Sequence, residues 1–583
     1  MKKSVRFARS PVLAPRLPRW RQRLLLALVL GGLAALIGRA AYLQGVDSEF
    51  LGDMGKARFE RVLELPATRG RISDRHGDVL AVSTPVRSIW AIPQDTEGLT
   101  PTQTRQLAGL LGLGVRDLNA RLDSERGFVY LKRQIPPPQA ERIMALKLPG
   151  IHQATEYRRY YPSAELMAHM IGFTGVDETG QEGIEKAFNG QLQGRPGSRR
   201  VIKDRRGNVV EDVGSEQPPV QGKDLALALD AKIQYLAYSY LQQALTQHHA
   251  KGGGVVVLDA RSGEVLALVN LPTYNPNNAA RRVSEDVRNR ALTDNFEPGS
   301  TLKPFTIALA MDEDKVTFDT PIQTAPGHMS IGPATISDSH AHGVLSVAQV
   351  IQKSSNVGAA KIALMMQPRD MWSMFSSAGF GAPLRLGFPG EASGHLRPAA
   401  TWRPIEQATM SYGHGISVTL IQLAHAYLAF ARDGDLLPLS LTRLDAPPAG
   451  GRRLFTAKTA QEVRKMMEMV VEPGGTAPLA RIPGYRVAGK TGTARKIEDG
   501  RYVRKYVASF AGFAPASAPR LIVAVMVDEP SNGKYYGGEV AAPVFAQVMG
   551  ASLRTLGVAP DAPTTATATP QAAPAGDDAG EEM

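Results

Sequence analysis

Residues 297–304 read Glu297-Pro298-Gly299-Ser300-Thr301-Leu302-Lys303-Pro304, and the fold can be deduced outward from this stretch. The apolar run 305–311 predicts a helix, and Pro304 fits its first turn, where N–H groups have no intrahelical acceptor. The i,i+3 spacing places Lys303 beside Ser300 on one helix face. A serine hydroxyl needs a base to take its proton, and a lysine whose pKa is lowered by burial or by another cation can be that base. The stretch therefore predicts a nucleophilic serine with a lysine base.

The serine-x-x-lysine pattern has little specificity alone, since it recurs in the turn-rich segment 531–534. Two further patterns follow it, Ser354-Ser355-Asn356 between helical stretches and Lys490-Thr491-Gly492-Thr493 on a late strand. Taken singly, the first is also explained as the N-cap of a helix that begins at Val357, and the second as a charged edge strand. The three patterns in this order are the signature of penicillin-recognising acyl transferases.

The two later patterns supply groups that the reaction needs. Asn356 presents an amide for a substrate carbonyl, and Ser354 can relay a proton between the leaving group and the lysine. Lys490 keeps the site cationic, which favours a neutral Lys303 and attracts a substrate carboxylate.

The strand that carries Lys490 also predicts substrate contacts. Thr491 and Thr493 are two residues apart, so they face the same side of the strand and can donate to the substrate carboxylate. Gly492 between them leaves room for the ligand. Backbone N–H groups of Ser300 and Thr493 are the expected oxyanion hole.

Composition excludes several kinds of site. The 583 residues include no cysteine, so disulfides, thiolate zinc sites and cysteine nucleophiles are absent. The pair His340 and His342 has no evident third ligand, and we expect neither a metal nor a cofactor. Of the net charge of +12, the first 23 residues carry +8 with no acidic residue, which indicates membrane topology rather than a nucleic-acid partner.

The basic residues precede an apolar run at 24–43, which is long enough for a membrane helix of roughly 30 Å if Arg39 reaches toward the interface. A cleaved signal peptide is the alternative, since residues 38–40 loosely fit a small-x-small cleavage site. Because the apolar character continues beyond that site, we favour an uncleaved anchor. The positive-inside rule then keeps the N-terminus in the cytoplasm and exports the chain beyond the anchor.

The length and the changes in composition predict several segments. They are a basic cytoplasmic tail at 1–23, a membrane anchor at 24–43, a mixed α/β pedestal at 44–222, a catalytic domain at 223–556 and a disordered tail at 557–583.

The catalytic domain is predicted to be α+β. Strands at both ends enclose a helical middle, which indicates a central antiparallel sheet closed by remote strands, flanked by helices and carrying a helical lobe. The expected strands are 224–230, 254–259, 264–269, 485–493, 508–513 and 521–527, and the expected helices are 231–247, 346–352, 357–366 and 420–432.

In the pedestal we expect a strand at 61–65 and a helix at 138–148. The charged, turn-rich segment 69–77 is interpreted as a salt-bridged structural turn, because nothing nucleophilic lies near it. Segments 157–162 and 180–185 are interpreted as packing or hinge elements.

From the anchor to about residue 550 the chain resembles the class B penicillin-binding proteins, and among them the septal, FtsI-type D,D-transpeptidases. Besides the three ordered patterns, the resemblance rests on segments 69–77, 180–185, 272–276, 412–419 and 537–545.

The resemblance implies that Ser300 is acylated by a peptidoglycan stem peptide ending in D-Ala-D-Ala, that the terminal D-alanine leaves, and that an amine of a second strand takes the acyl group. It implies Lys303 as the general base, with Ser354, Asn356, Lys490 and Thr491 completing the site. β-Lactams imitate the substrate and leave a slowly hydrolysed ester.

The resemblance further implies a single-pass inner-membrane protein with a periplasmic catalytic domain at the division septum. An FtsW-type glycosyltransferase and other division proteins are the implied partners. Three different readings of the function remain open: an elongation-type class B protein, a β-lactamase-like hydrolase, and a non-catalytic division scaffold.

Overall fold

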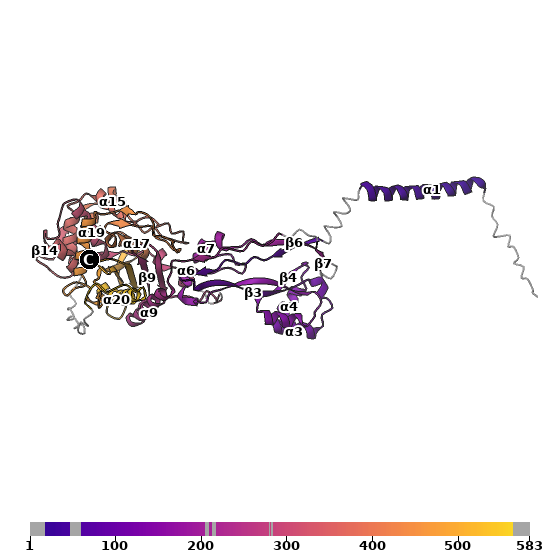
Figure 1. Cartoon of the computed structure of the whole chain (residues 1–583), viewed down its shortest axis with the longest axis horizontal. Helices are drawn as coiled ribbons and strands as arrows, with labels where there is room; N and C mark the ends of the chain where they lie inside the picture. The colour runs from indigo at the N-terminus through magenta and orange to yellow at the C-terminus, as the bar shows by residue number, and fades with distance from the viewer. Residues whose placement is uncertain are drawn as a thin grey trace, which may run out of the picture. The chain divides into compact units, whose positions relative to one another are not determined.

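The computed structural model describes residues 18–46, 60–203, 209–212, 217–278, 280 and 284–563 (Figure 1). The chain divides into two compact units, one formed by the residues up to Ala67 with Arg195–Val220, the other by Thr68–Gly194 with the residues from Gln221 onward. This division groups most of the expected pedestal with the catalytic domain, and the boundary expected at 222–223 stays a prediction. The basic residues up to 17 and the tail from 564 lie outside the described residues.

In the first unit, helix α1 (Arg19–Ala41) continues as a π-helical turn, Tyr42–Val46. Over Arg19–Gly45 its 27 residues are long and apolar enough to cross a membrane, and the described protein buries none of them. At 1.5 Å per residue this helix extends about 40 Å, more than the roughly 30 Å of a bilayer's hydrocarbon. The guanidinium carbon of Arg39 lies 5.5 Å from the ring centroid of Tyr42.

The same unit contains a three-stranded antiparallel sheet in the order β1-β6-β7. Its strands are β1 (Glu60–Leu65), β6 (Gly197–Lys203) and β7 (Val209–Asp212). The strand predicted at 61–65 is thereby confirmed.

The second unit is built on a five-stranded antiparallel sheet in the order β10-β9-β19-β18-β17. Its strands are β9 (Gly252–Asp259), β10 (Val265–Leu271), β17 (Ala488–Glu498), β18 (Arg501–Ala514) and β19 (Leu521–Asp528). Every residue of β9 and of β19 is buried, so helices cover both faces of the sheet. Remote strands thus close one sheet, as the sequence predicts.

Helices α9 (Ala231–His248) and α20 (Gly537–Thr555) pack on each other and on this sheet, and α11 (Arg290–Thr293) and α17 (Leu420–Ala426) pack on β9 (Figure 1). Further α-helices in the part of this unit after residue 283 are α10 (Ser284–Val287), α12 (Lys303–Asp312), α13 (Val347–Lys353), α14 (Asn356–Ala363), α15 (Pro368–Ser377), α16 (Pro404–Met410), α18 (Leu428–Ala431) and α19 (Ala457–Met469). Short two-stranded sheets pair β11 (Pro321–Gln323) with β14 (Val344–Ser346), β12 (His328–Ile331) with β13 (Ala334–Ser337), and β15 (Asp435–Leu436) with β16 (Arg452–Arg453).

The strand predicted at 224–230 is wrong in length, because only β8 (Leu225–Ala226) is a strand. Beyond it the backbone bonds go to several partners: Leu227 donates to the carbonyl of Ser73, and Ala228 donates to the carbonyl of Leu441. The segment therefore joins several elements instead of extending one ladder.

A second sheet runs through residues 72–160, in which β3 (Val79–Ala91) pairs with β2 (Ile72–Ser73), β4 (Val129–Ile135) and β5 (Ile151–Tyr160). Helices α3 (Pro101–Leu111), α4 (Val115–Leu122) and α5 (Pro137–Met144) pack there around a separate apolar core that includes Ile89, Leu107, Leu131 and Ile143. The helix predicted at 138–148 corresponds to α5, which ends four residues earlier.

The residues nearer the catalytic domain share its apolar core instead. Ile72 and Leu80 belong to the same buried cluster as the central sheet, and β2 pairs in parallel with β8. Helices α6 (Ala168–Ile171), α7 (Gly183–Ala187) and α8 (Asn189–Leu192) also lie in this region. This shared core joins the adjoining parts of residues 68–194 to the central sheet.

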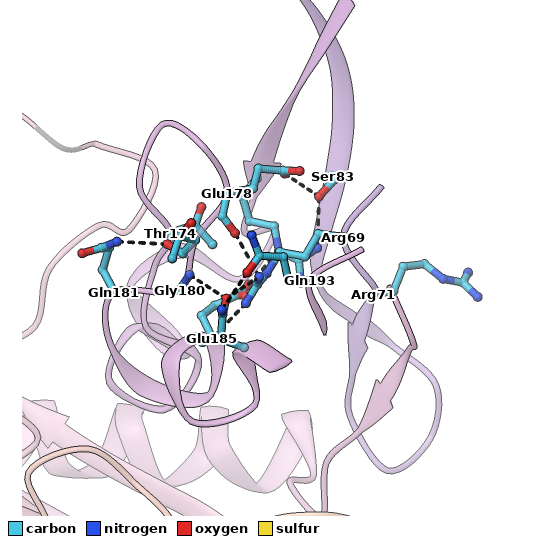
Figure 2. A network of polar contacts seen from close by, with 12 residues as sticks. Arg69, Arg71, Ser83, Thr174, Glu178, Gly180, Gln181, Glu185 and Gln193 are labelled. Atoms are coloured by element: carbon cyan, nitrogen blue, oxygen red, sulfur yellow. Dashed lines mark hydrogen bonds and ion pairs between the residues drawn. The ribbon is translucent and has the colours of Figure 1, made fainter. Parts of the chain in front are cut away.

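A buried ion triad stabilises this junction, and Figure 2 shows two of its members, Arg69 and Glu185. The Glu185 carboxylate accepts from Nε of Arg69 at 2.5 Å and from Nε of Arg159 at 2.6 Å. Arg69 also donates to the carbonyls of Glu178 and Glu185, at 2.9 and 2.7 Å. The triad joins the segments 69–77, 157–162 and 180–185, so their interpretation as structural and packing elements is confirmed for these residues.

Replacing Glu185 is expected to destabilise the protein strongly. In Glu185→Gln two buried guanidinium groups lose their countercharge, and removal of one partner of a buried pair costs about 3–5 kcal/mol. The midpoint of thermal unfolding, followed by circular dichroism, measures this.

The matched control is Asp224→Asn, since Asp224 pairs with Arg71 at 2.8 Å where both side chains are more than half exposed. An exposed pair contributes less than about 1 kcal/mol. Equal stability of the Glu185→Gln and parent proteins would contradict a structural role for the triad.

Candidate active site

The stretch 297–304 forms a 3₁₀ turn, Gly299–Leu302, that runs directly into α12 at Lys303. Ser300 is half-buried in this turn, and Lys303 is buried at the first position of α12, with the i,i+3 spacing that predicts a shared face. Pro304 occupies the first turn of α12. Tyr427 holds the turn by donating from its hydroxyl to the carbonyl of Thr301 at 2.9 Å.

Two lysines with no exposed surface meet at the hydroxyl of Ser354. Nζ of Lys303 lies 3.1 Å from this hydroxyl, and Nζ of Lys490 lies 3.0 Å from it. Lys303 also donates to the Ser354 carbonyl and, at 2.8 Å, to Oδ1 of Asn356. Lys490 donates to Oγ1 of Thr491 at 3.1 Å. The structure thus brings together residues from all three sequence patterns.

Burial dominates the electrostatics of the pair. Burial lowers the pKa of Lys303 to about 7, against a weaker opposing effect of the Asp338 carboxylate. Burial and the charge of Lys303 lower the pKa of Lys490 well below its ordinary value. Because both amines face one hydroxyl, a proton on one disfavours a proton on the other, and the two lysines titrate as a coupled pair. At neutral pH one of them is therefore available as a base.

The Ser354 segment combines a structural and a chemical function. Ser354 ends α13 in the left-handed conformation, with φ of 60°, and Ser355 caps α14 by accepting from the Gly358 N–H at 2.9 Å. The N-cap interpretation is thus correct for Ser355, and α14 begins at Asn356 rather than Val357. This division of roles leaves Ser354 and Asn356 directed at the lysines.

Asp338 supports this segment and was not identified from the sequence. Its carboxylate accepts from the Ser355 hydroxyl at 2.6 Å and from the Val357 N–H at 2.9 Å, while Nδ2 of Asn356 donates to the Ser337 carbonyl at 2.9 Å. Asn356 is therefore held from both ends of its amide, by Ser337 and by Lys303. No local sequence pattern marks an aspartate that acts from a different loop.

Strand β17 carries Lys490, Thr491, Gly492 and Thr493 beside the Ser300 turn. A Cβ placed on Gly299 would lie 3.5 Å from the Thr493 nitrogen, so the two expected oxyanion-hole segments are neighbours. The Thr493 hydroxyl accepts from the Gly537 N–H at 3.0 Å, and the Thr491 hydroxyl contacts that of Thr476 at 3.1 Å.

Gly492 does not leave room for a ligand, so the prediction for this residue is wrong. A Cβ on Gly492 would lie 2.6 Å from the Pro298 carbonyl oxygen and closer still to the Ser509 hydroxyl. The Ser509 side chain of β18 and the Ser300 turn fill the space at this glycine, so Gly492 allows β17 to approach that turn.

The competing serine-x-x-lysine at 531–534 has a structural role. The Ser531 hydroxyl donates to the carbonyl of His249 at 2.9 Å, and the Ser531 N–H donates to the carbonyl of His248. These bonds fix the loop after β19 against the end of α9, away from the buried lysine pair.

Comparison with known proteins agrees with this geometry. Residues 253–550 match the penicillin binding protein transpeptidase domain, and residues 64–227 match the penicillin-binding protein dimerisation domain. The chain therefore belongs to the penicillin-binding protein transpeptidases, with the two-domain architecture of class B, and the resemblance seen in the sequence is confirmed.

Among its relatives, the probable peptidoglycan D,D-transpeptidase PenA of Neisseria gonorrhoeae is 46% identical over 540 residues, which cover 92% of each chain. The peptidoglycan D,D-transpeptidase FtsI of Escherichia coli is 44% identical over 553 residues, covering 94% of this chain and 93% of the relative. The solved transpeptidase domain of Burkholderia pseudomallei penicillin-binding protein 3 is 50% identical with a TM-score of 0.54, covering 58% of this chain and 98% of that one.

Acylation of the protein is expected to depend on pH with an inflection near 7. The lowered pKa of Lys303 means that its amine is neutral above about pH 7 and protonated below it. Only the neutral amine accepts the serine proton, so the acylation rate constant falls about tenfold per pH unit below the inflection and levels above it. Rates of labelling by a fluorescent penicillin between about pH 5.5 and 9 measure this.

Lys361 provides the control, since it lies on the neighbouring helix α14 and donates to the Gln323 carbonyl. Lys361→Gln is expected to keep the inflection. A rate that stays constant from about pH 6 to 8 in the parent protein would contradict a neutral lysine base.

Proposed function

We propose that this protein is a peptidoglycan D,D-transpeptidase that cross-links stem peptides during septal wall synthesis through an acyl-enzyme at Ser300. The observation that carries the proposal is the pair of buried lysines at the Ser354 hydroxyl, one of which, Lys303, begins α12 three residues after Ser300. The activity printed for the Neisseria and Escherichia relatives supports it.

The first half of the reaction forms an ester. Oγ of Ser300 attacks the carbonyl of the penultimate D-alanine, and the serine proton passes to the neutral amine of Lys303. The backbone N–H groups of Ser300 and Thr493 stabilise the resulting oxyanion. When the peptide bond breaks, the proton returns to the leaving D-alanine nitrogen, and the Ser354 hydroxyl, which contacts both lysines, is the proposed relay.

The second half transfers the acyl group. The amine of a second stem peptide attacks the Ser300 ester, its proton passes to the lysine pair, and Ser300 leaves reprotonated. The Lys490 amine and the Thr491 hydroxyl on β17 are the proposed hydrogen-bond donors to the substrate carboxylate. A β-lactam forms the same ester but keeps its leaving nitrogen tethered, so the ester persists.

The membrane helix, the relatives' names and the positive-inside rule together support a single-pass inner-membrane protein with a cytoplasmic N-terminus and a periplasmic catalytic domain. Placement at the septum and contact with an FtsW-type glycosyltransferase and other division proteins are parts of the same proposal. Septal localisation of a fluorescent fusion distinguishes it from an elongation-type protein.

The Ser300→Ala protein is expected to lose covalent labelling by fluorescent penicillin completely, because an alanine side chain cannot form the ester. Labelling is measured by in-gel fluorescence against the purified parent. Labelling of Ser300→Ala at full stoichiometry would contradict the assignment of the nucleophile.

The lifetime of the ester in the labelled parent protein separates a transpeptidase from a hydrolase. An ester that lasts many minutes supports a transpeptidase, whereas release within seconds supports a β-lactamase-like hydrolase. Normal division in cells that carry only the Ser300→Ala protein would support a non-catalytic scaffold.

A further inference from the structure

Glu297 opens the stretch 297–304 but has no role in the acyl transfer at Ser300 proposed for this protein. Its carboxylate accepts a hydrogen bond from the Gly415 N–H at 2.8 Å. Both carboxylate oxygens also lie 3.1 Å from the hydroxyl of Tyr502. Glu297 lies three positions before Ser300, and its carboxylate thus connects the Ser300 turn to Gly415 and Tyr502, which are 118 and 205 positions away along the chain.

The bond to Gly415 repeats a connection that the backbone already makes. Phe296 and Val418 exchange two backbone hydrogen bonds, at 3.0 and 2.9 Å, and the Gly299 N–H donates to the Gly413 carbonyl at 3.3 Å. The turn before Ser300 is therefore fixed to the segment 413–418 with or without the Glu297 side chain. The bond to Tyr502 is different, because it reaches the hairpin of β17 and β18.

Tyr502 is the second residue of β18 and lies near the outer end of that hairpin, beside the turn at Asp499 and Gly500. Ion pairs hold this part of the hairpin toward β19: Lys496 binds Asp528 at 2.9 Å and Glu529 at 2.6 Å. Tyr502 supplies the connection toward the Ser300 turn. The outer end of the hairpin thus contacts β19 and the residue after it through Lys496, and the Ser300 turn through Tyr502.

The inner end of the same hairpin is set by close backbone approach. Gly492 packs against the Pro298 carbonyl and Gly299 packs against Thr493. A rigid hairpin held at both ends keeps β17 at a fixed separation from the turn. That separation sets the distance between the N–H groups of Ser300 and Thr493, which form the oxyanion hole in the proposed reaction.

Aromatic rings lie next to Tyr502. The His414 ring lies 5.1 Å from that of Tyr412 and 6.0 Å from that of Tyr502, and Nζ of Lys303 lies 5.9 Å from the Tyr412 ring. Burial, with Lys303 and Arg495 nearby, lowers the pKa of His414 to about 4, so this ring is neutral at pH 7. His414 therefore provides no competing charge for Glu297.

We propose that Glu297 is a positioning residue for acyl transfer: through Tyr502 its carboxylate holds the β17–β18 hairpin against the turn that carries Ser300. This inference rests on the proposed function, because the positioned groups are its nucleophile and its oxyanion hole. Glu297 touches neither the substrate nor the reacting atoms and acts through the hairpin.

The test compares Glu297→Gln, Tyr502→Phe and the double variant in the full-length protein in detergent. Glu297→Gln keeps an acceptor for Gly415 and loses the charge, while Tyr502→Phe keeps the ring beside His414 and loses the donor. A hydrogen bond to a charged group corresponds to about a tenfold change in rate when it is made only in the productive geometry. Each single variant is therefore expected to acylate about tenfold more slowly at saturating fluorescent penicillin, with little change in the concentration for half saturation.

Three further readouts distinguish positioning from folding. All variants are expected to reach one label per chain at long times, because the active fraction is unchanged. The double variant is expected to be no slower than the slower single variant, because both remove one interaction. The matched control is Glu498→Gln, which removes an exposed carboxylate of the same hairpin that binds Lys505 at 2.7 Å, and it is expected to label at the parental rate.

Parental rates in Glu297→Gln and Tyr502→Phe would overturn the proposal. A reduced labelled fraction at an unchanged rate constant, or equal slowing in Glu498→Gln, would also overturn it. Labelling of Ser300→Ala is a separate outcome: it would remove Ser300 as the nucleophile, whatever the Glu297 variants do.

Discussion

Two lysine side chains without exposed surface donate to one serine hydroxyl, and the remainder of the catalytic domain is arranged around this interaction. Burial of an ammonium group is costly unless acceptors replace the lost water, and here the acceptors come from the Ser354 segment and from Thr491. Burial also lowers the pKa of both amines, which makes one of them a base at neutral pH. Burial of the two amines therefore lowers the stability of the protein and at the same time provides the base for the reaction.

This interaction requires three elements to meet at short distance, and each approach has its own physical cause. The Ser300 turn reaches β17 because Gly492 has no side chain to hold it away from the Pro298 carbonyl. The Ser354 segment reaches Lys303 because Ser354 adopts a left-handed conformation between α13 and α14 and Asp338 holds the residues after it. The central sheet brings β17 into place through strands that are far apart in the sequence.

Local sequence patterns explain why much of the fold and of the candidate active site is predictable from the sequence. The helix after Pro304 and the hairpin of β9 and β10 follow from composition and spacing over fewer than about twenty residues, and each of the three motifs is itself a short local pattern. The fold class predicted from these patterns is confirmed, and the lysines predicted to act with Ser354 lie at its hydroxyl. The features that were missed depend on contacts that no local pattern encodes: Asp338 acts on Ser355 from a separate loop, and Glu185 meets Arg69 across 116 positions.

The function of Gly492 was misjudged because a sequence does not show which group approaches a glycine. The strand at 224–230 was overestimated because its alternation does not show that its bonds go to several partners.

The proposed reaction directs acylation to one serine of the three in the ordered motifs. Peptide mapping by mass spectrometry of the protein after brief exposure to penicillin tests this most directly. We expect a single adduct, on the peptide that contains Ser300. An adduct on the peptide that contains Ser354 and Ser355, with Ser300 unmodified, would contradict the assignment.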